Sequence, residues 1–393
     1  MKAFEKPIRI GMVGGGPGAG IATAHRAGMR LDGRYALVAG AFSRDAEKSR
    51  AAARELGVNE SRVYASYEDM AAAEAARDDG IEAVAVVTPN ASHYGVSKAF
   101  LEHGIHVICD KPITDDLEDA LALHELAEKK GLVFVLTHNY SAHAMVREAA
   151  VRVRRGDLGE VRMVQGEFAS GWAAGQVEKD TDNKQAAWRT DPVQAGEASV
   201  IYDLGTHIHH LARYVSGLSL EALAADVSTV VPGRRVYDNA NVMLRFAGGA
   251  RGAFWITMAA TGAEHGLSLR VIGSKASLTW CHEDPHHLTI AWPDGRRETI
   301  LQGGAAQSDA AAALTRIGLG HPEGFLESFA NIYSDAATAI AACRDGVRPE
   351  RGPLDYPNTA DGVLGLQFVE AVRKSAAADG QWMDIETITT LGC

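Results

Sequence analysis

The stretch that decides the fold is IRIGMVGGGPGAG at residues 8–20 of the 393-residue chain, an apolar run that predicts a buried strand followed by glycines. Gly14, Gly16 and Ala19 have the G-x-G-x-x-A spacing of a dinucleotide-binding turn, and the residues after 20 read as a helix. Glycine lets the backbone approach a pyrophosphate closely, and the helix N-terminus offers unpaired N–H groups to its negative charge. A tight structural turn is the alternative, but the position between the first strand and the first helix favours nucleotide binding. The residues that would hold the phosphates are Gly14, Gly16, Pro17, Gly18 and Ala19.

Strand and helix signals alternate through the first 137 residues. After the opening strand, buried-strand runs are predicted at 35–42, 81–88, 106–109 and 133–137, with helical stretches between them. We expect the helix before the last of these strands to have Thr114 as its N-cap and to end at Gly131. This alternation is typical of right-handed βαβ units, so it predicts an α/β Rossmann domain, with a doubly wound parallel sheet, over residues 1–137.

The pattern changes in residues 138–393, where seven runs read as successive strands. Gly248 and Gly249 between two of them predict a hairpin turn, and 324–343 and 358–377 read as closing helices. Consecutive strands with short connections predict an α+β domain with an open, mostly antiparallel sheet, which we expect to bind substrate and to mediate oligomerisation. The seven runs are 161–168, 223–231, 240–246, 251–257, 267–272, 276–280 and 288–291.

The composition excludes several classes of protein. With 41 glycines, 46% hydrophobic and 23% charged residues, the chain is neither collagen-like nor disordered. The net charge of −11, without a basic patch, makes nucleic acid an unexpected partner. The N-terminal residues show no signal peptide and no run of 18 apolar residues occurs, so we expect a cytoplasmic protein without a membrane partner. The four cysteines contain no CxxC pair, which argues against a disulfide framework or a zinc site; they are Cys109, Cys281, Cys343 and Cys393.

The end of the second strand bears on the choice of cofactor. A carboxylate at this position normally binds the ribose diol of NAD. Ser43 and Arg44 stand there instead, and a hydroxyl with a guanidinium can accept the 2′-phosphate of NADP, which a carboxylate would repel. Asp45 follows, and it either serves the diol or caps the next helix. The sequence therefore predicts NAD or NADP, with a slight preference for NADP.

Three further motifs together resemble those of one oxidoreductase family. They are VTPNASHY at 87–94, CDKP at 109–112 and DLGTH at 203–207, and they resemble the glucose–fructose oxidoreductase and inositol dehydrogenase family, Gfo/Idh/MocA. The resemblance implies NAD(P)-dependent oxidation or reduction of a sugar, a sugar derivative or a cyclitol, by a homo-oligomer (dimer or tetramer). The family's usual glutamate before Lys-Pro is Asp110 here, which keeps a carboxylate. The resemblance also implies a set of residues that contact the cofactor, namely Thr88, Pro89, Asn90, His93, Asp110 and Lys111.

Lys111 is the first candidate catalytic residue. Oxidation of a secondary alcohol needs a base for the hydroxyl proton, and a positive donor helps to hold the developing alkoxide. Lys111 directly follows a buried strand, and ligands of doubly wound sheets bind at the carboxyl ends of strands. A solvated loop lysine paired with Asp110 is the alternative. By resemblance, we expect the Lys111–Pro112 peptide to be cis.

His207 is the second candidate catalytic residue, with Asp203 as its partner. The two are four residues apart and therefore share one face if the segment is helical. Imidazole ordinarily has a pKa near ~6.5, which suits a base at neutral pH, and the aspartate would orient the ring. A histidine satisfied within the core is the alternative. The adjacent apolar stripe consists of Leu204, Ile208, Leu211 and Val215.

Other residues are candidates for contacts with substrate. Asn139 and Tyr140 resemble the family's substrate-side pair. In a polar loop, the Trp188 face would pack on the C–H surface of a sugar and Arg189 would donate to its hydroxyls, although a surface loop anchored by Trp188 is the alternative. Asn90 and His93 are expected to line the nicotinamide or substrate cleft, unless His93 caps a helix. His209 and His210 have no third ligand cluster, so no metal is expected.

The sequence thus supports an NAD(P)-dependent dehydrogenase acting on a ring hydroxyl or ketone of a sugar or cyclitol. One alternative is a glycosidase of the same fold that uses NAD transiently and releases an aglycone. A second is a non-catalytic nucleotide-sensing protein, which would tolerate loss of Lys111 and His207.

Overall fold

The computed structural model describes residues 6–180, 182–347, 352 and 356–385, and the chain divides into two compact units that are described separately. The first unit comprises Met1–Ala142 and Gly324–Val363, and the second comprises His143–Glu323 and Leu364–Cys393. The observed break after Ala142 lies five residues beyond the expected end of the Rossmann domain. The chain also returns to the first unit near its end, which the expected division did not include. The physical reason is burial: Ile332, Tyr333 and Ile340 belong to the same hydrophobic core as the first strand.

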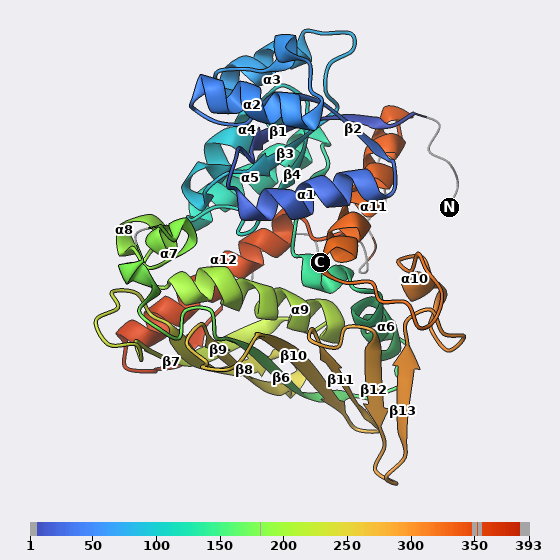
Figure 1. Ribbon diagram of the computed structural model, residues 1–393. Helices are drawn as coiled ribbons and strands as arrows, with labels where there is room; N and C mark the ends of the chain where they lie inside the picture. The colour runs from blue at the N-terminus through green and yellow to red at the C-terminus, as the bar shows by residue number, and fades with distance from the viewer. Residues whose placement is uncertain (1–5, 181, 348–351, 353–355, 386–393) are drawn as a thin grey trace. The chain divides into compact units, whose positions relative to one another are not determined.

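A parallel five-stranded sheet with the order β2-β1-β3-β4-β5 forms the centre of the first unit (Figure 1). Every pairing in it is parallel, which confirms the doubly wound sheet that the strand–helix alternation predicts. β3 is buried along its whole length, in keeping with its uninterrupted apolar sequence. The strands are β1 (Ile8–Gly14), β2 (Tyr35–Ala41), β3 (Ala83–Val87), β4 (His106–Cys109) and β5 (Phe134–Leu136).

The helices of the first unit begin and end at residues of the expected chemistry. Asp45 and Ser66 cap α2 and α3 through their side chains, and Gly131 ends α5 in the left-handed conformation at φ 65°. The expectation that Thr114 caps α5 is wrong, because Asp116 caps it and the Thr114 hydroxyl donates to the Asp116 carbonyl instead. The helices are α1 (Gly20–Leu31), α2 (Ala46–Leu56), α3 (Tyr67–Ala75), α4 (His93–Glu102), α5 (Leu117–Lys130) and α11 (Phe325–Arg344); α12 (Thr359–Ala377) begins in this unit.

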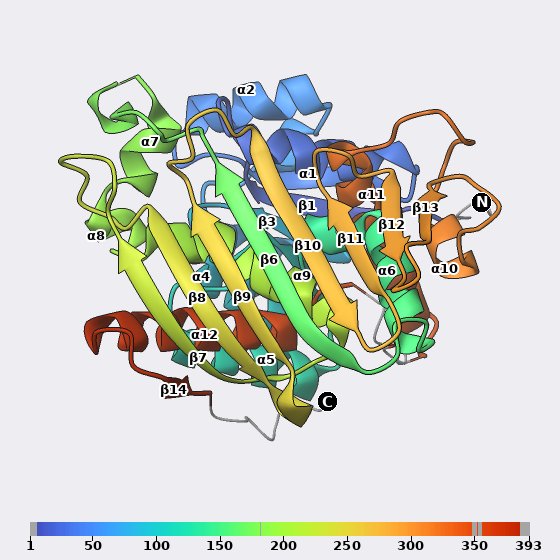
Figure 2. The same cartoon turned by 90° about the horizontal axis from the view of Figure 1, so that it is seen from below.

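The second unit is built on a nine-stranded sheet with the order β13-β12-β11-β10-β6-β9-β8-β7-β14 (Figure 2). Only the pairing of β6 with β9 is parallel among those described, so the sheet is mostly antiparallel, as expected. The hairpin turn expected at Gly248 and Gly249 joins β8 to β9. The strands are β6 (Val161–Ser170), β7 (Leu220–Ser228), β8 (Asn239–Phe246), β9 (Arg251–Thr257), β10 (His265–Gly273), β11 (Ser277–Cys281), β12 (His287–Ala291), β13 (Arg297–Leu301) and β14 (Met383–Asp384).

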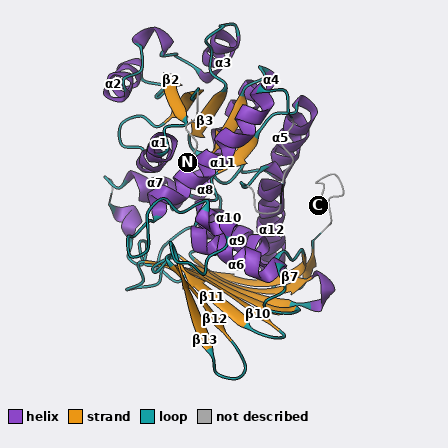
Figure 3. Ribbon diagram, turned by 90° about the vertical axis from the view of Figure 1, so that its right-hand side faces the viewer, coloured by secondary structure: helices purple, strands orange, loops and turns teal. Residues whose placement is uncertain are grey.

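One face of this sheet is covered and the other is open. Helices α6 (Ala144–Arg154) and α9 (Thr206–Ser216) lie along the covered face (Figure 3). Residues on β8 alternate accordingly, since Val242 and Leu244 are buried while Asn241, Met243 and Arg245 are exposed. Short helices α7 (Lys184–Arg189), α8 (Pro192–Ala195) and α10 (Asp309–Ala312) lie in the connections.

Two expectations concern the chain as a whole. Within the described residues, no helix combines the length and the apolar character needed to cross a bilayer. Cys109 and Cys281 are free thiols, and Cys393 lies outside the described residues.

Candidate active site

The glycine-rich turn between β1 and α1 is held against the carboxyl ends of the neighbouring strands. Gly14 has φ 83°, and a Cβ there would lie 2.2 Å from the carbonyl oxygen of Val87 in β3. A Cβ on Gly16 would lie 2.8 Å from the carbonyl oxygen of Phe42, just after β2. Both positions therefore require glycine, because a side chain would collide with backbone atoms that cannot move aside.

The N-terminus of α1 fits a bound diphosphate. Its N-cap residue, Ala19, provides no side-chain hydrogen bond, and the first turn of the helix contains no acidic residue. The N–H groups of this turn therefore have no side-chain cap, unlike those of α2, α3 and α5. A Cβ on Gly20 would meet nothing within 4 Å, and Pro17 and Gly18 are exposed, so the turn opens to solvent on this side. These residues fit the phosphates of NAD(P), which such N–H groups bind.

Two residues that follow β2 have different surroundings: Asp45 caps helix α2, whereas Arg44 faces the solvent. The Asp45 carboxylate accepts hydrogen bonds from the N–H groups of Glu47 and Lys48 at 3.0 and 3.1 Å, so Asp45 caps α2. These bonds, with the contribution of Lys48 first among them, hold the pKa of Asp45 below its usual value. The Ser43 hydroxyl accepts from the N–H of Asp45 at 3.1 Å, and the Arg44 side chain is exposed. Of the two roles open for Asp45, the structure therefore shows the cap.

His93 joins two of the sequence motifs. Its side chain is fully buried, with Nδ1 2.7 Å from the carbonyl oxygen of Pro112 and Nε2 2.9 Å from that of Thr88. His93 is the first residue of α4, whose N-cap is Ser92, and its ring links the turn after β3 to the Lys-Pro turn after β4. In the short 3-10 turn of Asn90–Ser92, the Ser92 hydroxyl bonds to Thr88 Oγ1 and the Pro89 carbonyl at 2.8 and 2.7 Å. His93 thus fixes the turns that follow β3 and β4, and Thr88, Pro89 and Asn90 lie in the first of them.

Asp110 anchors the backbone at Lys111, whose bond to Pro112 is cis, as the resemblance implied. Its Oδ1 accepts hydrogen bonds from the N–H of Lys111 at 2.9 Å and the hydroxyl of Thr137 at 2.8 Å, and it lies 3.8 Å from Nε2 of His25. Burial raises the pKa of Asp110, but the neighbouring His25, together with the charge of Lys111, outweighs it and holds that pKa well below its usual range. Asp110 is therefore ionised and fixed by three groups, two of them distant in sequence.

Sequence reasoning missed the residues behind Asp110. His25 lies in α1, and its Nδ1 is 2.9 Å from the hydroxyl of Tyr333 in α11, a residue 308 positions away. Burial raises the pKa of Tyr333 well above its usual value, so its hydroxyl stays protonated. No motif surrounds either residue, and only the packing of α11 on α1 brings them together.

Asn139 and Tyr140 lie in the 3-10 turn Asn139–Ala142 after β5, and both are buried. The Asn139 amide donates to the Ser328 hydroxyl at 3.1 Å, and the Tyr140 ring centroid is 6.2 Å from that of Phe325. Both contacts are with α11. The amide nitrogen of Asn139 therefore helps to hold this turn against α11.

The second unit carries the other candidate residues, on a π-helical turn that leads into α9. Asp203 lies in that turn (Ile201–Gly205), and His207 follows in the first turn of α9 with 8% of its surface exposed. The expected stripe of Leu204, Ile208, Leu211 and Val215 is buried. The helical spacing predicted from sequence is confirmed, with a local widening of the helix of a kind often found at functional sites.

Arg189 holds Asp203 in place. Its Nε donates to Oδ2 of Asp203 at 3.0 Å, and its guanidinium lies over the rings of Trp188 and Trp172 at 4.3 and 5.8 Å. The expected polar loop at 188–189 is instead the end of helix α7. Arg189 is thus engaged with a carboxylate and two indoles, and this indicates a role in positioning Asp203.

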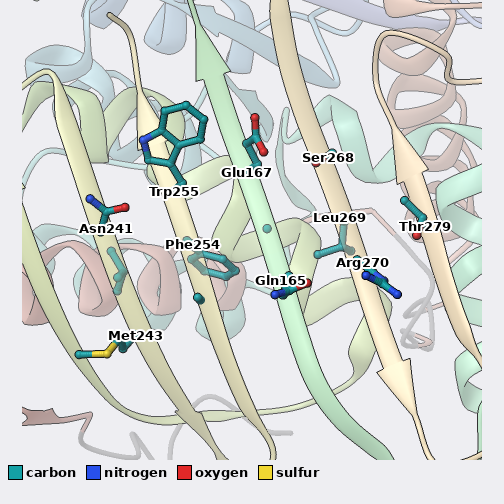
Figure 4. Close-up of a pocket in the computed structure, with 13 residues that line it drawn as sticks. Gln165, Glu167, Asn241, Met243, Phe254, Trp255, Ser268, Leu269, Arg270 and Thr279 are labelled. Carbon is teal, nitrogen blue, oxygen red and sulfur yellow. The ribbon is translucent and has the colours of Figure 1, made fainter. Parts of the chain in front are cut away.

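A shallow pocket lies on the open face of the nine-stranded sheet (Figure 4). It encloses about 450 Å³. Trp255 and Met243 supply apolar surface beside the polar side chains of Glu167, Gln165 and Arg270. These residues lie opposite the face that α9 covers, because Phe168 and Val164, which alternate with them on β6, are buried. Among the described residues, no group of three or more His, Cys, Asp or Glu is placed to hold a metal ion.

Comparison with known proteins identifies the family. Residues 8–138 match the model of an oxidoreductase family with an NAD-binding Rossmann fold, and residues 146–279 match that of the GFO/IDH/MocA C-terminal domain. The chain belongs to the Gfo/Idh/MocA family. The resemblance read from the three motifs is therefore confirmed, and with it the cofactor NAD(P) of a family of sugar-type oxidoreductases.

Individual members of the Gfo/Idh/MocA family match this chain over nearly its whole length. An uncharacterised oxidoreductase of Bacillus subtilis, YfiI, is 34% identical over 388 residues, 98% of each chain. The crystal structure of an inositol dehydrogenase homologue from Azotobacter vinelandii with NAD⁺ is 37% identical with a TM-score of 0.92, covering 98% of both chains. A structure of such a homologue from the same organism with NADH and myo-inositol is 36% identical with a TM-score of 0.89, covering 97% of this chain and 98% of that one.

Proposed function

We propose that the protein is an NAD(P)-dependent dehydrogenase that moves hydride between the nicotinamide and a ring hydroxyl or ketone of a sugar, sugar derivative or cyclitol. The observation that carries the proposal is the aspartate–histidine pair at the start of α9, with Asp203 held by Arg189 at 3.0 Å. The relative with NADH and myo-inositol supports a cyclitol or sugar as the substrate. Bound NAD(P) supplies the hydride acceptor or donor, and the remaining chemistry is a proton transfer.

His207 would take the proton from the substrate hydroxyl through its imidazole. Asp203, anchored by Arg189, would orient that ring and stabilise the imidazolium that forms. Lys111 would hold the substrate oxygen through its positive charge and can share in the proton transfer. Asp110 fixes the Lys111 backbone by accepting its N–H at 2.9 Å, which keeps the lysine at the carboxyl end of β4.

The test is a screen of sugars and inositols with NAD⁺ and NADP⁺, followed by stopped-flow kinetics of hydride transfer. His207→Ala and Lys111→Ala should each reduce turnover by ~10²–10⁴, while cofactor affinity stays within a few fold. The exposed residues His103 and Lys129 provide matched alanine controls with unchanged turnover. Near-normal turnover in both active-site variants would refute the dehydrogenase proposal and favour a nucleotide sensor. Release of an aglycone without net reduction of cofactor would instead reveal a glycosidase.

We also propose that Ser43 and Arg44 accept the 2′-phosphate of NADP. Asp45 caps α2 through Oδ1, which accepts the N–H groups of Glu47 and Lys48. The exposed Arg44 guanidinium is therefore the charged group at the end of β2 that a 2′-phosphate would meet.

The open face of the nine-stranded sheet is proposed as the surface through which copies of the chain assemble. Met163, Met243 and Trp255 are 44%, 55% and 41% exposed on it, and a second copy of the chain could bury these apolar side chains. Glu167 and Arg270 on neighbouring strands provide opposite charges that a second copy can pair. Trp255→Glu should shift the mass measured by light scattering from the oligomer to the monomer. An unchanged mass would place the interface elsewhere.

A further inference from the structure

A group of histidine rings lies at one end of the sheet in the second unit, outside every motif discussed so far. His265 begins β10 and His282 directly follows β11, and the N–H of His282 donates to the Leu267 carbonyl at 2.8 Å. Their ring centroids are 5.4 Å apart, and His143, just before α6, is also 5.4 Å from His282. We call His143, His265 and His282 the histidine wall.

The histidine wall is continuous with the proposed base. The Phe168 ring lies 4.9 Å from His265 and 6.2 Å from His207, so a single aromatic ring separates the wall from His207. The register of β6 with β10 pairs Phe168 with Leu267. Since side chains alternate along a strand, His265 shares the covered face with Leu267. The wall therefore lies on the same face of the sheet as α9.

Two rings of the wall, those of His143 and His282, are neutral hydrogen-bonding groups. Burial, together with His265, lowers the pKa of His282 to about 4. Burial and the neighbouring His282 and His286 lower the pKa of His143 to about 3. At neutral pH each such ring presents one N–H donor and one nitrogen acceptor. Nε2 of His143 is buried and has no hydrogen-bond partner among the described residues, whereas His265 and His282 are only partly buried.

A carboxylate stands beside the wall. Glu283, which follows His282, accepts the backbone N–H of His265 at 3.2 Å. An anionic ligand group placed against the neutral imidazoles would be desolvated next to a negative charge, which is costly. Ring hydroxyls, by contrast, can donate to and accept from the imidazoles without such a cost.

We propose that His265 and His282 form a subsite that binds the hydroxyls of an uncharged, polyhydroxylated ring and discriminates against phosphorylated or carboxylated sugars. This inference rests on the proposed dehydrogenase function, and it concerns hydroxyls other than the reacting one. The two histidines are therefore specificity residues of the same site, and His143 supports the wall from α6.

The experiment compares steady-state kinetics of His265→Phe and His282→Phe, which keep a ring but remove its nitrogens. On the best neutral substrate of the screen, for example myo-inositol or D-glucose, KM should rise about ten- to a hundredfold with kcat and cofactor affinity within a few fold. His282→Asn should recover part of the affinity, because the amide restores a donor and an acceptor. His287→Phe, at the start of β12 with a partly exposed ring, is the matched control and should keep the wild-type KM. Thermal unfolding of each variant shows whether it is folded.

The second arm replaces the neutral substrate by a charged counterpart, glucuronate or glucose 6-phosphate. The wild-type protein should show at least a hundredfold lower kcat/KM on these, and His282→Lys should narrow the gap by tenfold or more. A KM within twofold of wild type in both phenylalanine variants, or a wild-type preference for the charged sugars, would overturn the subsite alone. A wild-type protein that oxidises no sugar or cyclitol would overturn the proposed function itself, and the subsite with it.

Discussion

Replacing Asp110 with asparagine tests whether the carboxylate behind Lys111 stabilises the first unit. Oδ1 of Asp110 accepts two hydrogen bonds, from Lys111 and Thr137, and lies 3.8 Å from Nε2 of His25. A hydrogen bond to a charged acceptor contributes about 1.5–3 kcal/mol and one to a neutral acceptor about 0.5–1.5 kcal/mol, so each bond weakens by roughly 1 kcal/mol. Nε2 of His25 lies 3.8 Å away, beyond hydrogen-bond distance, so the loss of this contact adds at most about 1 kcal/mol more. The expected loss in the free energy of unfolding is therefore about 2–3 kcal/mol.

The assay is thermal unfolding at several pH values, with the exposed residue Asp78 as a matched Asp→Asn control. For a unit of this size the loss corresponds to a decrease in Tm of roughly 4–12 °C at pH 7. The folded pKa of Asp110 lies below the unfolded value, so its stabilisation is complete above about pH 5 and decreases as the pH falls below about 4. The stability difference between wild type and Asp110→Asn should shrink over the same range. A difference below about 0.5 kcal/mol at pH 7, or one that does not change between pH 7 and pH 3, would refute the reasoning.

Three more predictions concern the cofactor side of the first unit. Arg44→Ala should weaken NADP(H) binding about ten- to a hundredfold more than NAD(H) binding in fluorescence titrations, and an equal loss for both would contradict the 2′-phosphate contact. Gly16→Val should abolish cofactor binding and also lower Tm, because its Cβ would lie 2.8 Å from the Phe42 carbonyl oxygen, whereas Gly20→Ala should leave Tm unchanged. His93→Phe removes the single N–H that a neutral ring donates to one of two facing backbone carbonyls, so it should cost about 1–3 kcal/mol by chemical denaturation, and wild-type stability would show that this bond contributes nothing.

Local sequence determined the elements and the chemistry of the motifs. The apolar run at 81–88 predicts a buried strand, and β3 (Ala83–Val87) is buried throughout. The spacing of Asp203 and His207 beside a buried stripe was readable because helical periodicity is a local property. The glycine turn was readable for the same reason, since backbone approach without a Cβ restricts the choice of residue at Gly14 and Gly16. These features depend on residues within about one helical turn or one strand of each other.

Only the tertiary structure decided which distant residues surround Asp110 and which residues form the histidine wall. His25 and Tyr333 stand behind Asp110 because α11 packs on α1 in one core, and no local pattern encodes that packing. His265 and His282 meet because β10 and β11 pair in one particular register. A shift of that register by one residue would turn the shifted side chain to the open face of the sheet. Such contacts are set by the free energy of burying whole faces of sheets and helices. Periodicity predicts that a face will be buried, but only the folded chain determines what lies against it.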